Sequence, residues 1–300
     1  MEFKKYTHIE RLGTIETEGI LEGDCYIFPK IDGTNASIWM GDEYIECGSR
    51  RGKLTLTDDN RGFWQYVHQH SEFNDFFTKY PDLKLYGEWL VPLTIRQYGD
   101  FAWRNFYVFD VEKDGKYMSY DEYHPILQEM NITHIPLMAK IHNPTMEQLK
   151  NLLNLNSYLI DTNKTGDGIG EGIVIKNYDF INKYGDPCFA KIVRSEFHQR
   201  HNTVRKRAKS RNVNNELEVE IADTYCTEAF VRKEHAKIID KNGGWSSKMI
   251  PQLLGTVYHE VINEDIWHII KNYKNPTINF TELQRQIQNK TKERLPEVFA

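Results

Sequence analysis

The chain changes character once along its length, and this change limits the folds that it can adopt. Up to residue 197, short runs rich in β-branched and aromatic residues alternate with glycine and aspartate, which is typical of strands joined by turns. We expect strands at 25–28, 36–40, 44–47, 83–89, 106–111 and 172–175. Helical periodicity predicts helices at 61–77, 120–130 and 145–155. The pattern favours an α+β domain in which antiparallel sheets are flanked by helices.

A basic stretch follows this first part. Six arginine and lysine residues lie between positions 200 and 211, and no acidic residue occurs from 197 until Glu216. Beyond it, apolar residues at spacings of three and four predict helices at 219–240, 248–263, 264–272 and 281–295. We therefore expect an N-terminal domain over 1–197, a basic linker over 198–215 and a small all-α domain over 216–300.

The charge balance and the cysteines exclude several classes of protein. With 38 basic and 43 acidic residues the net charge is −5, so any affinity for nucleic acid must come from a local basic surface. The mean hydropathy of −0.63 leaves no candidate for a membrane span, and the charged N-terminus lacks the apolar core of a secretory signal. Four scattered cysteines give neither a disulfide framework nor a zinc motif, so we expect a reducing, cytoplasmic setting without membrane partners.

The most informative residue is a lysine that ends an apolar run and enters a glycine-containing turn, Lys30-Ile31-Asp32-Gly33. A lysine in this position faces a pocket while a strand end holds it in place. Its amine is a nucleophile only without its extra proton, and the usual pKa of a lysine is about 10.4. A second cation at ~4 Å lowers such a pKa by roughly 3 units, and Lys176 and Lys191 are candidates for that cation. Taken alone, the four-residue string more often marks a surface turn.

Five further segments accompany this lysine in a fixed order, at 49–52, 86–89, 106–110, 171–176 and 190–194. Together they resemble the motifs of the covalent nucleotidyltransferase superfamily of ligases and RNA-capping enzymes. The closest likeness is to the RNA ligase 2 type known from bacteriophage T4. It spans nearly the whole chain, including the opening Phe3-Lys4-Lys5-Tyr6, the basic linker and the helical C-terminal part.

The resemblance implies an ATP-dependent RNA ligase that joins a 3′-hydroxyl to a 5′-phosphate. Such enzymes transfer AMP from ATP to the motif lysine, pass it to the RNA 5′-phosphate and then seal the ends with release of AMP. Lys30 would be the nucleophile. The implied cofactors are ATP and Mg²⁺ or Mn²⁺, and the implied substrate is nicked duplex or broken structured RNA. We expect a monomer in the cytoplasm, or in the host cytoplasm if the chain is encoded by a phage.

Carried over by position, the resemblance also assigns nucleotide contacts. Arg50 would hold the ribose and later the RNA end, Glu88 would reach a ribose hydroxyl, and Phe109 would stack on adenine. Lys176 and Lys191 would contact the α-phosphate during catalysis. Pro29, Ile31 and Asn35 would complete the nucleotide site. Each assignment has a plainer alternative, namely a solvated arginine, a strand-end carboxylate, a core phenylalanine or a surface lysine.

Glu171 lies between a glycine-rich loop and an apolar strand, which predicts a place at the rim of a pocket. Mg²⁺ needs only one or two carboxylates when phosphate and water supply its other ligands. We therefore expect Glu171, with Asp32 and Asn35 acting mostly through water, to hold the metal and to take part in catalysis.

For RNA, the basic stretch offers the clearest phosphate contacts, although charged runs are often only solvated. The residues that we expect to bind RNA are Arg50, Arg194, Arg200, Arg205, Lys206 and Arg207.

Two departures from the family pattern qualify these assignments. Close relatives carry an acidic residue before the motif lysine, where this chain has Pro29, so the selectivity for adenine is less firmly predicted. The last motif often reads Lys-x-Lys, whereas Val193 stands at the second position here and Arg194 follows it.

Two alternative functions also stay open. One is a GTP-dependent mRNA capping guanylyltransferase, although those enzymes usually add a β-barrel domain. The other is a catalytically inactive RNA-binding relative.

Overall fold

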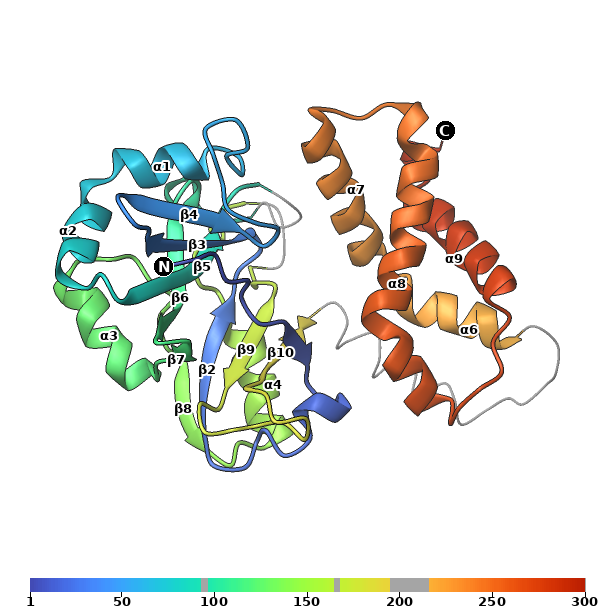
Figure 1. Ribbon diagram of the computed structural model, residues 1–300. Coiled ribbons are helices and arrows are strands. Elements are labelled where there is room, and N and C mark those ends of the chain that lie inside the picture. Colours follow the sequence, from blue (N-terminus) through green and yellow to red (C-terminus); the bar gives the residue numbers. More distant parts are fainter. Residues whose placement is uncertain (93–96, 165–167, 195–215, 300) are drawn as a thin grey trace. The chain divides into compact units, whose positions relative to one another are not determined.

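The computed structural model describes residues 1–92, 97–164, 168–194 and 216–299 (Figure 1). They form two compact units, Met1–Ile192 and Val193–Ala300. The first unit contains two five-stranded sheets with helices, and the second is helical. The α+β fold with a helical C-terminal part is therefore confirmed. The basic residues Arg200, Arg205, Lys206 and Arg207 lie outside the described residues.

The first sheet has the strand order β1-β10-β9-β2-β8. These strands span Ile9–Arg11 (β1), Phe189–Val193 (β10), Gly172–Lys176 (β9), Asp24–Lys30 (β2) and Ala139–His142 (β8). β2 lies antiparallel to both β8 and β9, while β1 and β10 form a parallel pair. The pairing of β2 with β9 brings the lysine motif beside the segment that begins at Glu171.

The second sheet has the order β4-β3-β5-β6-β7 and is antiparallel throughout. Its strands span Ile45–Ser49 (β4), Thr34–Met40 (β3), Leu83–Trp89 (β5), Phe106–Lys113 (β6) and Lys116–Tyr117 (β7). A two-residue turn joins β6 and β7 into a hairpin. Asp114 and Gly115 have φ angles of 50° and 81°, the left-handed values that a two-residue turn of this kind requires.

Four helices accompany the sheets, at Phe63–Gln69 (α1), Ser71–Lys79 (α2), Tyr120–Glu129 (α3) and Met146–Leu155 (α4). α1 and α2 contact β4, α3 contacts β6 and α4 contacts β9 (Figure 1). One hydrophobic cluster joins both sheets to α1, α2 and α3, and its buried members include Phe28, Ile38, Phe63, Leu85 and Tyr123. The two sheets are thereby fixed to each other, so the side chains at their facing ends keep a constant geometry.

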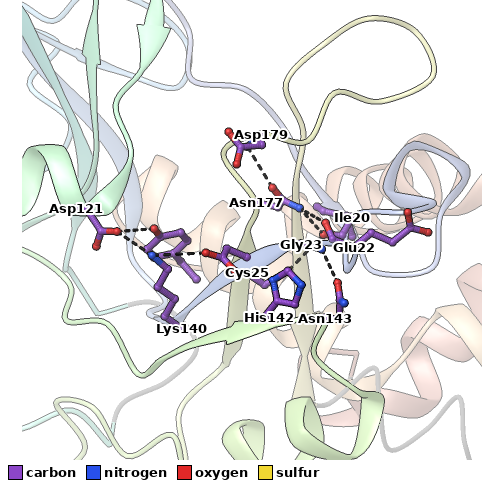
Figure 2. Close-up of polar contacts among 12 residues, drawn as sticks. Ile20, Glu22, Gly23, Cys25, Asp121, Lys140, His142, Asn143, Asn177 and Asp179 are labelled. Carbon is purple, nitrogen blue, oxygen red and sulfur yellow. Dashed lines mark hydrogen bonds and ion pairs between the residues drawn. The ribbon is translucent and has the colours of Figure 1, made fainter.

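Polar contacts fix β2 at the end opposite to its motif lysine (Figure 2). Lys140 on β8 donates to Asp121 at 2.9 Å. The N–H of Gly23, just before β2, donates to the side chain of Asn143 at 2.6 Å. The amide of Asn177 donates to two backbone carbonyls of the loop that leads into β2. With one end of β2 held in this way, its other end can carry Lys30 at a defined position.

The second unit consists of α6 (Glu216–Tyr225), α7 (Glu228–Asn242), α8 (Ile250–Asn272) and α9 (Phe280–Arg294). Its core is built from aliphatic side chains of all four helices, among them Ile221, Val231, Leu253, Val257 and Leu283. None of the helices among the described residues combines the length and the apolar composition needed to cross a membrane.

Several predicted boundaries differ from the observed ones. The segment 61–77 forms two helices because His70 adopts an extended conformation. The segment 219–240 also forms two, since Thr227 caps α7 by accepting a hydrogen bond from the N–H of Phe230. In contrast, 248–263 and 264–272 belong to one helix, α8, in which no glycine or proline interrupts residues 256–272.

Candidate functional site

Two neighbouring strands of the first sheet bring the motif lysine to a carboxylate. Lys30 is the last residue of β2 and lies opposite Gly172, the first residue of β9. Glu171 therefore projects from the same end of the sheet. The distance from Lys30 Nζ to Glu171 Oε2 is 2.5 Å, and the two side chains are only 20% and 10% exposed. The lysine amine is held in one place and still reaches solvent.

The alternation of side chains along the strands determines which residues share the face of Lys30. Phe28 on β2 and Val174 and Lys176 on β9 point to this face, because Phe28 pairs with Val174. On β10, the ring of Phe189 lies 5.4 Å from Lys176 Nζ and so points to the same face. Lys191, two residues further along β10, must then share it. The register thus brings three motif lysines, Lys30, Lys176 and Lys191, to one side of the sheet.

A pocket opens at this end of the sheets, with about 430 Å³ of space that includes open solvent at its mouth. Six of the residues expected to bind nucleotide or to act in catalysis line it, namely Pro29, Lys30, Ile31, Glu88, Phe109 and Lys176. The other lining residues are apolar, namely Ile9, Phe28, Ile135 and Val174. A pocket with aromatic and aliphatic walls and a few polar groups suits a planar base.

Phe109 lies between a buried layer and this pocket. Its ring is 4.8 Å from the ring of Tyr6, and it is only partly buried. Phe109 therefore packs against the core and also forms part of the pocket wall. The pocket-facing part of the ring can accept a base, while the other part is held by aromatic neighbours.

Lys176 differs from the expected phosphate ligand, because its ammonium already has protein partners. Its Nζ lies 2.7 Å from Asp110 Oδ1 and donates to the Phe109 carbonyl at 2.5 Å, with exposures of 2% for Lys176 and 0% for Asp110. Burial lowers the pKa of Lys176 and raises that of Asp110, and their mutual attraction opposes both shifts. Tyr6 donates its hydroxyl proton to the other oxygen of Asp110.

Three aromatic rings surround the ammonium of Lys176. Nζ lies 4.8 Å from the ring centre of Phe28, 5.5 Å from that of Phe109 and 5.4 Å from that of Phe189. Cation–π attraction in a dry site adds to the ion pair. In this geometry Lys176 fixes the backbone and ring of Phe109, so it is a positioning residue at the bottom of the pocket.

The environment of Lys30 also differs from the expectation. We predicted neighbouring cations beside its amine, whereas the structure places the carboxylate of Glu171 there and pairs the ammonium of Lys176 with Asp110. The physical reason is that each buried or half-buried charge requires an opposite partner. The proton of Lys30 therefore has an acceptor at hydrogen-bond distance.

Glu88 reaches the pocket from β5 and holds the turn after Lys30. Its Oε1 accepts a hydrogen bond from the N–H of Gly33 at 2.9 Å. Its pKa is raised to about 7, chiefly by burial, while Lys30 opposes this shift and the charges of Glu171 and Asp32 add to it. The carboxylate is thus poised to change its charge near neutral pH.

The motif turn itself is tightly packed. The N–H of Asp32 donates to the hydroxyl of Tyr98 at 2.9 Å, and Asp32 is only 4% exposed. A Cβ atom on Gly33 would lie 2.5 Å from the carbonyl oxygen of Trp89, which explains the glycine at this position. The sequence interpretation missed Tyr98, which has no motif around it.

Arg50 and Asn35 lie on the second sheet near the same end. Arg50 follows β4 directly, is exposed, and its Nη2 lies 2.8 Å from Nδ1 of His8. His8 precedes the pocket residue Ile9 in the chain. Asn35 pairs with Glu88 across β3 and β5, although it does not line the pocket. Arg194 is partly buried and belongs to the second compact unit.

The carboxylates of this site fit a hard divalent cation. Glu88, Glu171 and Asp32 are close enough that the charges of the last two raise the pKa of the first. A dication would relieve this repulsion, and carboxylate oxygens are the ligands that Mg²⁺ and Mn²⁺ prefer. Among the described residues, however, no group of three or more His, Cys, Asp or Glu side chains is arranged to hold a metal by itself. The protein can therefore supply only part of a coordination shell.

Comparisons with known proteins agree with this geometry. The sequence model of the RNA ligase family matches residues 23–193, which is more than half of the chain. The chain belongs to the RNA ligase family. The match includes Lys30, Glu88, Phe109, Glu171, Lys176 and Lys191. A comparison with curated protein sequences gives no significant match.

Solved structures support the fold. A Naegleria gruberi RNA ligase with PPi is 18% identical with a TM-score of 0.50, over 67% of this chain and 58% of that one. A lysine-to-alanine mutant of a Naegleria gruberi RNA ligase with ATP and Mn is 19% identical with a TM-score of 0.50, over 67% and 60% of the two chains. The match spans about three fifths of the length of those ligases.

Proposed function

We propose that this member of the RNA ligase family uses ATP to join an RNA 3′-hydroxyl to a 5′-phosphate, through a covalent Lys30–AMP and then an RNA-adenylate. The observation that carries the proposal is the position of the Lys30 amine at the rim of a pocket suited to a base. The Naegleria gruberi structure with ATP and Mn supports ATP and a divalent metal as cofactors. Within the family, the order of the motifs and the helical second unit favour the RNA ligase 2 type.

In the first step, the Lys30 nitrogen would attack the α-phosphorus of ATP as pyrophosphate leaves. The amine must lose a proton to attack, and Glu171 is the acceptor within hydrogen-bond distance. Adenine would lie between the Phe109 ring and the apolar side chains of Phe28 and Val174. Lys191, which shares the face of Lys30, remains our candidate for the α-phosphate.

Glu88 would bind the ribose while it holds the turn that carries Lys30. Its ionised form only accepts hydrogen bonds, whereas its protonated form also donates one, so ribose binding should change with pH near neutrality. A divalent cation held by Glu171 and Asp32 would neutralise phosphate charge and orient the leaving pyrophosphate. Arg50, exposed beside the pocket, would bind the RNA end in the later steps.

In the second and third steps, RNA would bind over this pocket. We assign RNA contacts to Arg50 and Arg194, with the basic linker residues as further candidates. Structured RNA with a nick or break is the substrate that we propose, and repair of such breaks is the role. A single active site performs all three steps, so a monomer is sufficient.

The test uses purified protein with α-labelled ATP or GTP and Mg²⁺ or Mn²⁺, followed by a nicked RNA duplex. We expect label on the protein from ATP but not from GTP, then label on the RNA 5′ end, then a joined strand. Label from GTP alone would indicate the capping alternative. Absence of any covalent nucleotide with either metal would indicate an inactive relative.

A further inference from the structure

Two arginines meet beside the motif turn, in a part of the chain that no motif covers. Arg61 lies in the loop before α1, and Arg104 lies between β5 and β6. A Cβ atom built on Gly62 would be 3.7 Å from Nη1 of Arg104, so the Arg104 guanidinium lies against the Arg61–Gly62 backbone. Burial and, to a smaller extent, the positive charge of Arg104 lower the pKa of Arg61.

The backbone holds both arginines in unfavourable conformations. Arg61 has a φ of 64° and Arg104 a φ of 56°, left-handed values that a residue with a long side chain rarely adopts. Asn60, directly before Arg61, is left-handed as well, with a φ of 50°. Such strain persists only where the surrounding structure enforces it, and it often occurs at functional sites. Arg61 Nη1 also donates to the carbonyl of Pro92 at 3.4 Å, which helps to hold this side chain in place.

The residues directly before the two arginines, Asn60 and Trp103, link this region to the motif turn from two sides. The amide of Asn60 donates to the hydroxyl of Thr34 at 3.1 Å, next to Gly33. On the other side, the ring of Trp103 packs edge-on against Tyr98 with centres 5.4 Å apart, and Tyr98 accepts from the N–H of Asp32. Thr34 is four residues from Lys30, so the Cα atoms of these two residues lie within ~14 Å of each other.

The surface beside the pair is also suited to a nucleic acid. Arg104 is exposed, and in the described part of the chain no acidic side chain forms an ion pair with it. Phe101, three residues earlier in the same turn, is 72% exposed. An aromatic ring beside guanidinium groups is typical of surfaces that contact bases or riboses and phosphates together. A guanidinium donates two parallel hydrogen bonds to a phosphate, which a lysine cannot do.

The geometry points to a phosphate-binding site formed by Arg61 and Arg104, which holds the RNA backbone near the reactive end, with Phe101 against a neighbouring ribose or base. This inference rests on the proposed function, because it takes RNA as the ligand. It is independent of the basic linker and of Arg50. It also supplies positive charge on a unit whose pocket carries three neighbouring carboxylates.

The test is the double variant Arg61→Asn with Arg104→Asn, since asparagine tolerates the left-handed backbone while both guanidinium groups are removed. The matched control is Lys116→Gln, which removes one exposed charge at the far end of the β6–β7 hairpin. Binding of a nicked RNA duplex is measured across salt concentrations, and Lys30 labelling by ATP is measured in parallel. We expect the dissociation constant to rise about tenfold and the salt slope to fall by about 1 to 2, with labelling unchanged.

Unchanged RNA binding in the double variant would overturn the inference, and so would an equal loss in Lys116→Gln. Slower labelling with unchanged RNA binding would assign the pair to the phosphates of ATP instead and would also overturn it. If the double variant does not fold, the single variant Arg104→Asn decides, because that side chain is exposed. The two proposals fail differently: wild-type protein that forms no lysyl-AMP contradicts the proposed function, whereas active wild type with unaffected variants contradicts only the arginine site.

Discussion

The buried ion pair between Lys176 and Asp110 gives the sharpest prediction about the pocket. Asp110→Asn keeps the shape of the side chain and removes its charge, which leaves the Lys176 ammonium among three aromatic rings. The pair is 2.7 Å long and almost fully buried, and breaking such a pair from one side usually costs about 3–5 kcal/mol. We therefore expect the free energy of unfolding at pH 7 to fall by about 3 kcal/mol or more. ATP binding should weaken as well, because Lys176 anchors the Phe109 carbonyl.

Two controls isolate the cause. Adding Lys176→Met to Asp110→Asn removes both charges and fills the aromatic cage with an apolar chain, so most of the lost stability should return. Asp82→Asn breaks the exposed pair with Lys113, which is 2.9 Å long, and should cost less than about 1 kcal/mol. Urea unfolding followed by tryptophan fluorescence measures all three. The reasoning is refuted if Asp110→Asn costs no more than Asp82→Asn, or if the second substitution restores nothing.

Three further predictions concern single residues. The pKa of Glu88 is raised to about 7, so its protonated form stabilises the fold at low pH, and this contribution is lost as the pH rises through 7. Between pH 5 and 8, the free energy of unfolding of the wild type should fall by about 1–3 kcal/mol, whereas that of Glu88→Gln should not show this fall. If urea unfolding gives the same pH dependence for both proteins, the prediction is wrong. Gly33→Ala places a Cβ 2.5 Å from a backbone carbonyl, and we expect a loss of about 1–3 kcal/mol together with weaker labelling by ATP. Thr227→Ala removes the cap of α7 and should lower stability by about 1 kcal/mol without affecting labelling, as thermal unfolding and the labelling assay can show.

Much of the fold could be predicted because the local patterns are strong. The strands 83–89 and 172–175 were placed within one residue of their observed ends, since their apolar runs are bounded by clear turn residues. The strands β1, β7, β8 and β10 were missed, and the first three of them have only two to four residues each. The helix boundary at Thr227 was also missed. Apolar periodicity continues across it, and only the cap hydrogen bond ends the pattern.

Some features of the site could likewise be predicted from the sequence, and others could not. Lys30, Glu88, Phe109 and Lys176 could be placed together because their motifs occur in a fixed order, and the structure brings them to one pocket. The ion-pair and hydrogen-bond partners of these side chains could not be predicted, because they depend on contacts between strands that are distant in the sequence. The signal for one partner was present: Asp110 directly follows Phe109 within a motif segment, and a buried acidic residue on a strand requires a cation.

The central claim is that the amine of Lys30 carries the nucleotide, and the most direct measurement is the site of the covalent adduct. The protein is incubated with ATP and a divalent metal, denatured, digested and analysed by peptide mass spectrometry. We predict AMP on Lys30, no adduct in Lys30→Ala, and unchanged modification in a control variant of an exposed lysine, Lys116→Gln. An adduct on any other residue, or one that persists in Lys30→Ala, would contradict the account.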